Sequence, residues 1–395
     1  MAKDKNKKKK TIVPEAEISK KELSPREMLE TAVDNLNKEM EKLETNKFKF
    51  YFFVIDTKGA PNGSLAYIYE TAMHLKNKGY DVAMLHSEKE FIGVGSWLGE
   101  EYAKLRHFNI ENDGVRISPS DFLIIPELYS NVMYQTKKLP CKRIALLQNY
   151  NYLTEIIQPG ASWGDYGIID CITTTPKLEK HIKEVFPYLR TNVVRPSIID
   201  KFTYSGKPKK LFINLVTKSQ SDTNRIVKEF FWRYPTYKWV AFRDIRGLSQ
   251  DDLASALDEA FATVWVDERT DFGYSALQAM KAGNIVIGKI PEDEPDWMLE
   301  NGELKDCGVW FYKFNDVYDI ISGVVEAFMN DKLPEVLFTN MEDTVKYYDL
   351  ENQASDIEMV YIDGFVEKRK EEITTALSLA KDKLESMDSE NKEEA

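Results

Sequence analysis

The chain has 395 residues, of which 43% are hydrophobic and 30% charged, and its formal net charge is −12 at pH 7. That length suits two or three domains, and the composition is typical of a folded globular protein rather than a disordered or membrane-embedded one. The acidic balance disfavours a general nucleic-acid-binding surface, because neutralising phosphates requires clustered basic residues.

Targeting and cofactor signals are sparse. The Lys-rich start is not followed by the apolar segment of a secretory signal, and no apolar run reaches the roughly 18 residues of a membrane-spanning helix. The three cysteines, Cys141, Cys171 and Cys307, form no C-x-x-C pair, the four histidines are scattered, and there is no Asp-x-Asp motif. We therefore expect a cytoplasmic protein without a disulfide framework or a metal site.

Residues 1–47 read as an appendage to the first domain. Ser24, Pro25 and Glu27 predict a helix start with a capping box. A heptad-like apolar stripe follows, made of Leu29, Val33, Leu36, Met40 and Leu43. Two interpretations stay open: the helix docks on its own domain, or residues 24–46 serve a partner helix or a homo-oligomer.

Residues 48–200 alternate between strand and helix patterns. The run 48–55 predicts a buried strand, the loop 59–63 precedes a helix, and 81–86 predicts the next strand. Further strands are predicted at 121–125, 143–147 and 168–173, and a further helix at 177–185. This alternation predicts a parallel sheet with helices on both faces, that is, a Rossmann-like domain.

The pattern pauses near Gly206 and then begins again, which predicts a second Rossmann-like domain over residues 201–333. Strands are predicted at 210–216, 238–242, 263–267 and 285–288, and helices at 223–234, 250–260 and 275–282. Residues 334–395 predict a helical, charged tail. The expected fold is therefore α/β, with two doubly wound domains, a helical N-terminal extension and a helical C-terminal tail.

The segment 262–288 carries the strongest functional pattern. A strand ends near Asp267, the polar turn 268–271 follows, and Gly273 opens a helix. A helix start presents free N–H groups and a positive dipole end, so it suits a diphosphate, and Gly273 permits close approach to the backbone. Gln278 lies near this helix start and can reach ribose hydroxyls. A glycine that simply begins a helix is the competing interpretation.

This segment resembles the donor-binding signature of the GT-B glycosyltransferases, in particular of the retaining family-4 type. Phe272-Gly273, Ala279-Met280 and Gly283 stand in register with that signature. The two signature acids, however, are replaced by Thr270 and Gln278. The resemblance therefore implies a catalytic region made of Thr270 with the neighbouring Asp271 and Glu268, and it leaves open whether the chain is catalytically competent.

The resemblance also implies binding residues in both domains and no need for a metal. Lys218 and Arg225, with Arg243 as a third cation, would clamp the donor diphosphate. Further donor contacts would come from Gly63 in the glycine-rich loop and from Phe272, Gly273, Tyr274 and Gln278. On the acceptor side, the implied residues are Asn62, Gln148 and Asn149.

The sequence thus predicts an enzyme that moves a sugar from a nucleoside-diphosphate sugar to an acceptor hydroxyl in a cleft between the domains. The acceptor could be a glycan, a protein or a nucleic acid. Two alternatives remain: a non-catalytic GT-B-like sugar-binding or scaffold protein, which the loss of both signature acids favours, and a nucleic-acid-modifying glycosyltransferase, against which the acidic charge counts.

Overall fold

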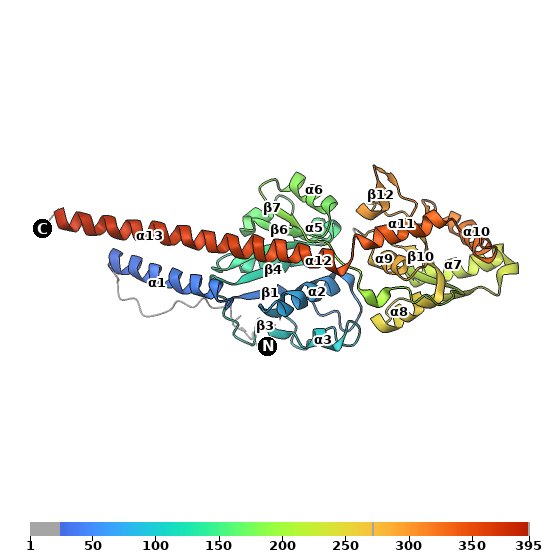
Figure 1. Cartoon of the computed structure of the whole chain (residues 1–395), viewed down its shortest axis with the longest axis horizontal. Coiled ribbons are helices and arrows are strands. Elements are labelled where there is room, and N and C mark those ends of the chain that lie inside the picture. Colours follow the sequence, from blue (N-terminus) through green and yellow to red (C-terminus); the bar gives the residue numbers. More distant parts are fainter. Residues whose placement is uncertain (1–23, 271, 394–395) are drawn as a thin grey trace, which may run out of the picture.

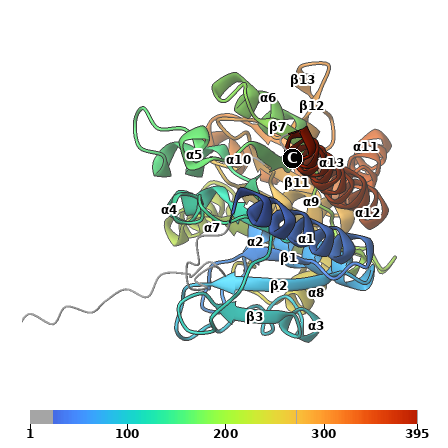
Figure 2. The same cartoon turned by 90° about the vertical axis from the view of Figure 1, so that its left-hand side faces the viewer.

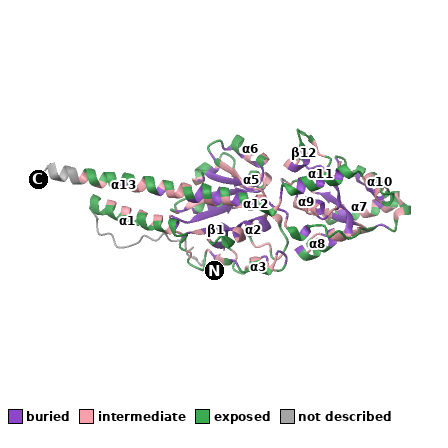
Figure 3. Cartoon of the chain, viewed as in Figure 1, coloured by how far each residue is buried: buried purple, intermediate pink, exposed green. Residues whose placement is uncertain are grey.

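The computed structural model describes residues 24–270 and 272–393, and the side chains of residues up to 387. Two α/β domains lie end to end, and a pair of helices projects from the first domain, away from the second (Figure 1). Buried residues concentrate in the strands of the two domains, whereas the projecting helices are mostly exposed or half-buried (Figure 3). The prediction of two doubly wound domains is confirmed.

The first domain has a parallel sheet with the strand order β3-β2-β1-β4-β5-β6-β7. Its strands are β1 (Lys49–Phe53), β2 (Asp81–His86), β3 (Arg106–Asn109), β4 (Phe122–Pro126), β5 (Lys142–Leu147), β6 (Asp170–Thr173) and β7 (Arg190–Val193). Its helices are α2 (Gly63–Asn77), α3 (Glu100–Ala103), α4 (Ser130–Gln135), α5 (Tyr150–Ile156) and α6 (Pro176–Val185), with single 3₁₀ turns η1 (Glu127–Tyr129) and η2 (Trp163–Tyr166). Every residue of the central strand β4 is buried, as expected for a sheet covered on both faces.

The second domain repeats the design with the strand order β14-β11-β10-β8-β9. Its strands are β8 (Lys210–Thr217), β9 (Ala241–Asp244), β10 (Ala260–Val266), β11 (Ile285–Lys289) and β14 (Val309–Phe311), beside a small hairpin of β12 (Leu299–Glu300) and β13 (Glu303–Leu304). Its helices are α7 (Gln220–Arg233), α8 (Gln250–Glu259), α9 (Tyr274–Lys281), α10 (Val317–Met329) and α11 (Glu335–Lys346).

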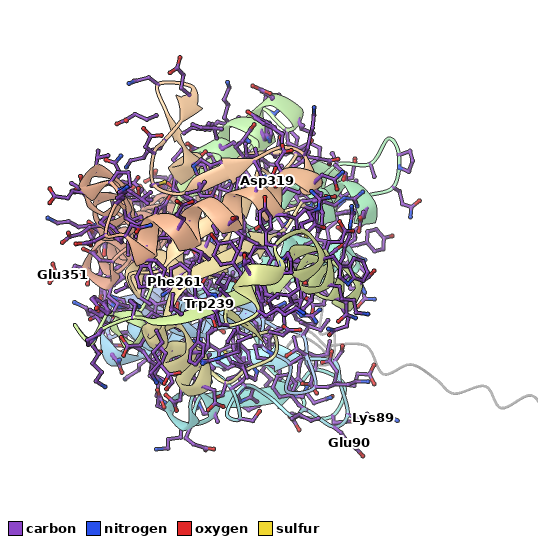
Figure 4. The ribbon with its side chains drawn as sticks, turned by 90° about the vertical axis from the view of Figure 1, so that its right-hand side faces the viewer. Lys89, Glu90, Trp239, Phe261, Asp319 and Glu351 are labelled. Atoms are coloured by element: carbon purple, nitrogen blue, oxygen red, sulfur yellow. The ribbon has the colours of Figure 1, made fainter. Side chains whose placement is uncertain are left out.

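Edge strands account for the main differences from the predicted elements. The strands β3, β7 and β14 were not predicted, because short, partly exposed edge strands carry no continuous apolar run. The edge strand β9 begins at Ala241, three residues later than predicted, because Trp239 is half-exposed rather than buried in the sheet. Figure 4 looks onto this end of the second domain, with Trp239 labelled below Asp319 of α10.

The C-terminal tail returns to the first domain. After α12 (Leu350–Ile357), a π-helical stretch over Glu358–Val366 leads into α13 (Glu367–Glu393). Tyr361 of this stretch is fully buried in the first domain's core, with its ring 5.8 Å from that of Phe50 on β1. The domains are therefore tied together by two chain crossings, the hinge near residue 200 and the returning tail.

The N-terminal helix α1 (Pro25–Glu44) docks on its own chain, as one of the two interpretations predicted. Ser24 and Glu27 form the predicted capping box. Leu43 is buried in the first domain's core, and α1 lies alongside α13 in both views (Figures 1 and 2). The apolar stripe of α1 is half-buried where the helix packs along α13, so this contact helps to stabilise α13.

Candidate active site

A cleft lies between the domains at the carboxyl ends of both sheets, which is where open parallel sheets bind ligands. It has a larger lobe of about 390 Å³ and a smaller lobe of about 190 Å³. The lobes share Asn62, Gly63, Lys218, Asp267, Tyr274 and Ser275. The larger lobe is walled by apolar side chains such as Phe202 and Leu253, whereas polar residues dominate the smaller lobe.

The start of α9 forms the junction of the two lobes. Gly273 has a φ of +76°, a left-handed conformation that glycine adopts without steric cost. Its N–H donates to the Thr270 hydroxyl at 2.9 Å, and Trp297 donates to the carbonyl of Phe272 at 2.6 Å. These bonds fix the turn before the helix. The first hydrogen bond within the helix is donated by the Ala276 N–H. The N–H groups of Tyr274 and Ser275, which precede it in α9, therefore have no partner within the helix, and both residues line the lobes.

Most of the predicted binding residues meet in this cleft. Gln278 lines the larger lobe. The smaller lobe receives Gln148, Asn149, Thr270, Phe272 and Gly273. The Lys218 ammonium lies 2.9 Å from the Asp267 carboxylate and lines both lobes, so the cleft holds a cation at the point where α9 begins.

The acceptor-side amides are held by the first domain. The Gln148 side chain donates to the carbonyl of Ser64 at 2.9 Å. The Asn149 backbone N–H donates to the Glu127 carboxylate at 2.9 Å, and the Asn149 side chain caps α5. Both residues are thus fixed beside the glycine-rich loop.

Two of the predicted cations do not line the cleft. Arg225 pairs with Glu229 on the outer part of α7 and also donates to Asn315. Arg243 pairs with Glu259 at 3.0 Å on the edge strand β9. Their placement gives no support to the predicted diphosphate clamp, because both guanidinium groups are engaged away from the lobes.

Neither of the two predicted catalytic acids is found among the described residues that line the cleft. Glu268 forms an ion pair with Lys289 and does not line either lobe. Asp271 lies outside the described residues. Thr270 reaches the smaller lobe, where its hydroxyl braces the turn at Gly273.

Several cleft residues escaped the sequence analysis. Asp267 follows β10 and is mostly buried, and Arg246 reaches the larger lobe from the loop after β9. Asp267 follows directly after β10, so its position at a strand end is a signal that could have singled it out. Arg246 is held by Asp244 and Gln220.

Four further polar atoms could not have been found without the folded chain. They are Glu70 Oε2, Trp97 Nε1, Gln250 Oε1 and Tyr274 Oη, which belong to residues that line the larger lobe and have no hydrogen-bond partner among the described residues. They come from both domains. The two domains meet here, because the backbone N–H of Gln250 in the second domain donates to the carbonyl of Trp97 in the first at 3.0 Å. Buried polar atoms usually have a partner, so this cluster is equipped to bind a polar ligand group.

Burial changes the acid–base properties of two members of this cluster. Removal of the Glu70 carboxyl from solvent raises its pKa to about 8, so the carboxyl is largely protonated at neutral pH. Burial, and secondly the nearby Glu70, raises the pKa of Tyr274 well above its usual value. At neutral pH both groups can therefore donate a hydrogen bond.

The two Rossmann-like domains and the cleft between them show that the chain has the GT-B glycosyltransferase fold. Solved structures share this architecture across most of the chain. Sucrose-phosphate synthase from Thermosynechococcus elongatus superposes with a TM-score of 0.56 at 12% identity, covering 80% of this chain and 99% of that one. The pneumococcal O-GlcNAc transferase GtfA, in complex with UDP and GlcNAc, superposes with a TM-score of 0.54 at 9% identity, covering 83% and 99%.

Sequence comparison adds one distant relative. The chain is 23% identical over 183 residues to an alpha-1,6-glucosyltransferase of Actinobacillus pleuropneumoniae serotype 7 (strain AP76). That match covers 45% of this chain and 56% of the relative, so the chain spans about half the length of the curated relative that it matches. No family model matches the chain. The predicted resemblance to GT-B glycosyltransferases is confirmed at the level of the fold.

Two searches of the described residues gave negative results. None of their helices is both long enough and apolar enough to cross a membrane. Within the same residues, no group of three or more His, Cys, Asp or Glu side chains is placed to hold a metal ion.

Proposed function

We propose that the chain is a glycosyltransferase that moves a sugar from a nucleotide-sugar donor to an acceptor hydroxyl in the interdomain cleft. The observation that carries this proposal is the junction at α9, where a glycine-opened helix start, Lys218 and Gln278 face the same cleft. A cation beside a helix N-terminus suits a diphosphate, and the amide beyond it suits a ribose.

The two lobes suit the two ends of such a donor. The larger lobe has apolar walls and the unpartnered polar atoms of Glu70, Trp97 and Gln250, which suit a nucleoside. The smaller lobe is polar and lies between the start of α9 and the acceptor-side residues Gln148 and Asn149, which suits the transferred sugar.

Transfer would rest on positioning and on neutralisation of the departing diphosphate, without a metal. Lys218 and the N–H groups at the start of α9 would stabilise the negative charge that develops on the leaving group. The first domain would hold the acceptor hydroxyl against the sugar. Thr270 would brace the turn, since its hydroxyl accepts the Gly273 N–H, and Asp267 would supply the carboxylate that the lobes share.

A non-catalytic sugar-binding role is the second candidate. It is favoured by the replacement of both signature acids, since position 270 is threonine and position 278 is glutamine. Both candidates bind a nucleotide sugar or a sugar, but only the first one turns over the donor.

A thermal-shift screen against UDP-, GDP-, ADP- and dTDP-sugars tests the donor binding that the first candidate requires. A donor present at about 100 times its Kd stabilises the fold by roughly 2.7 kcal/mol. We expect a shift with one nucleotide class that the Gln278→Ala variant loses and the Arg225→Ala variant keeps, because Arg225 lies outside the cleft. No shift with any donor would count against the first candidate.

Donor turnover then separates the candidates. Release of the free nucleoside diphosphate, measured with and without sugar acceptors, is expected for the enzyme. Donor binding without any release would favour the binding protein.

A further inference from the structure

A second hollow lies on the first domain and shares no lining residue with either lobe of the cleft. This groove, called here the Tyr134 groove, has a volume of about 560 Å³. It is lined by Ser130, Asn131, Tyr134, Ile156, Gln158 and Tyr166, together with Leu128. These residues come from η1, from α4, from α5 and the loop after it, and from η2.

Its lining combines aromatic rings with uncharged polar groups. Tyr134 is 64% exposed, and its ring stands edge-on to that of Tyr166 with centroids 6.0 Å apart. Asn131 and Gln158, which carry amide side chains, line the same groove. Ser130 is only 5% exposed, and its hydroxyl has no hydrogen-bond partner among the described residues. An exposed ring face with adjacent amides matches a sugar ring, which has an apolar C–H face and an edge of hydroxyls.

The walls of the groove are fixed relative to each other. The Arg143 guanidinium donates to the carbonyls of Met133 at 3.0 Å and Tyr166 at 2.9 Å, which joins α4 to η2. The Lys137 ammonium, two residues beyond the end of α4, donates to the carbonyl of Asp165 in η2 at 2.8 Å. A preformed groove binds with a smaller loss of conformational entropy than one that must assemble around its ligand.

Helix α5 contributes one residue to the cleft and another to the groove. Tyr152 lines the smaller lobe, and Ile156, four residues later on the same helix, lines the groove. Residues four apart share a helix face, and the rise between them is about 6 Å. A chain-like acceptor whose terminal hydroxyl reaches the smaller lobe would therefore extend along α5 into the groove.

The charge of the groove narrows the class of ligand. None of the described residues that line it is charged. A nucleic-acid acceptor would require cations along its phosphates. A neutral polyhydroxylated chain needs none.

We infer that the Tyr134 groove is a binding subsite for a neutral oligosaccharide, and that the acceptor is a glycan at least several sugars long. The part of this inference that concerns the acceptor rests on the proposed function. The part that concerns glycan binding stands on the groove alone.

The test is binding of the fluorescently labelled full chain to an array of neutral mono- to hexasaccharides of varied linkage. We expect binding that increases from mono- to oligosaccharides and falls roughly tenfold in Tyr134→Ala, as loss of a stacked ring predicts. Tyr312→Ala is the matched control, because Tyr312 is 69% exposed but lies on the second domain, outside the groove. Asn131→Ala tests the amide separately.

Three outcomes would overturn the inference: no glycan bound by the wild-type chain, glycan binding that is equal in Tyr134→Ala, or a Tyr134→Ala variant that changes the oligomeric state in size-exclusion chromatography instead. The donor screen on the same preparations separates this failure from failure of the proposed function. Donor binding without glycan binding refutes only the groove, and glycan binding without donor binding refutes only the transferase.

Discussion

The ring of Tyr274, at the start of α9 in the second domain, lies directly against the backbone of Gly63 in the first domain. A Cβ atom added at Gly63 would come within 2.7 Å of Tyr274 Cδ2. Tyr274 packs on the hydrophobic cores of both domains, so this contact sets how closely the two walls of the cleft approach each other. Only a residue without a side chain fits at position 63.

Gly63→Ala is therefore expected to weaken donor binding and to lower stability by about 1–3 kcal/mol through overpacking. Alanine favours a helix, so any loss at this first residue of α2 reports the contact with Tyr274. Gly323→Ala, inside α10 with nothing within 4 Å of the added Cβ, should instead be neutral or stabilising. Thermal melts with and without donor measure both effects. A Gly63→Ala variant that melts like the wild type and binds donor equally would contradict the prediction.

Gly273→Ala should disrupt the turn that begins α9. It combines a left-handed φ with an added Cβ 3.0 Å from Trp265. Gly206→Ala has a similar φ of +81° but open space around the Cβ, so it measures the backbone strain alone. We expect both variants to lose about 1 kcal/mol of stability, and Gly273→Ala to lose more and to bind donor poorly. Equal denaturation midpoints for the two variants would show that the contact with Trp265 is unimportant.

The stability of the chain should depend on pH through Glu70. Its pKa is about 8 in the folded chain, against an ordinary value of 4.5, so the folded state holds the proton more tightly than the unfolded state. The contribution of Glu70 to stability is then full below about pH 4.5 and is lost progressively as the pH rises towards about 8.

Glu70→Gln should flatten the profile of melting temperature against pH over this range, and should be more stable than the wild type by roughly 4 kcal/mol near pH 8. Glu90→Gln, at the exposed position labelled in Figure 4, is the control and should follow the wild-type profile. Parallel profiles for the wild type and Glu70→Gln would show that the carboxyl is ionised in the fold.

Lys218 and Arg225 provide a matched pair of cations. Both were predicted to hold the diphosphate, but only Lys218 lines the cleft. Lys218→Met is expected to reduce the kcat/KM of donor turnover by roughly tenfold or more, since it removes a charge from the leaving group. Arg225→Met should change it less than twofold, because Arg225 contributes an exposed ion pair with Glu229. Similar losses in both variants would contradict the assignment.

Chelation should leave the reaction intact. The proposal assigns charge neutralisation to Lys218 and the start of α9, so donor turnover is expected to be equal before and after dialysis against EDTA. Loss of turnover that Mg²⁺ or Mn²⁺ restores would show that a metal shares this role.

The sequence by itself determined the architecture, because alternating buried strands and amphipathic helices can bury their apolar faces only in layered α/β domains. It also located the Gly273 turn, since a left-handed glycine before a helix is a local property of the chain. The tertiary structure decided which side chains meet. Arg225 and Lys218 lie seven residues apart in one loop–helix segment, but the helix carries Arg225 to the outer side and leaves Lys218 in the cleft.

The limit of prediction from sequence is clearer still for three residues of the larger lobe, Glu70, Trp97 and Gln250. Each is unremarkable in its own segment: burial in the folded chain raises the pKa of Glu70, and the backbone carbonyl of Trp97 accepts a hydrogen bond from the backbone N–H of Gln250 in the other domain. The return of Tyr361 to the first domain was likewise invisible in the helical pattern of the tail. Local patterns fix where strands and helices form, whereas burial, pKa and the completeness of a site depend on contacts between distant segments, which only the folded chain creates.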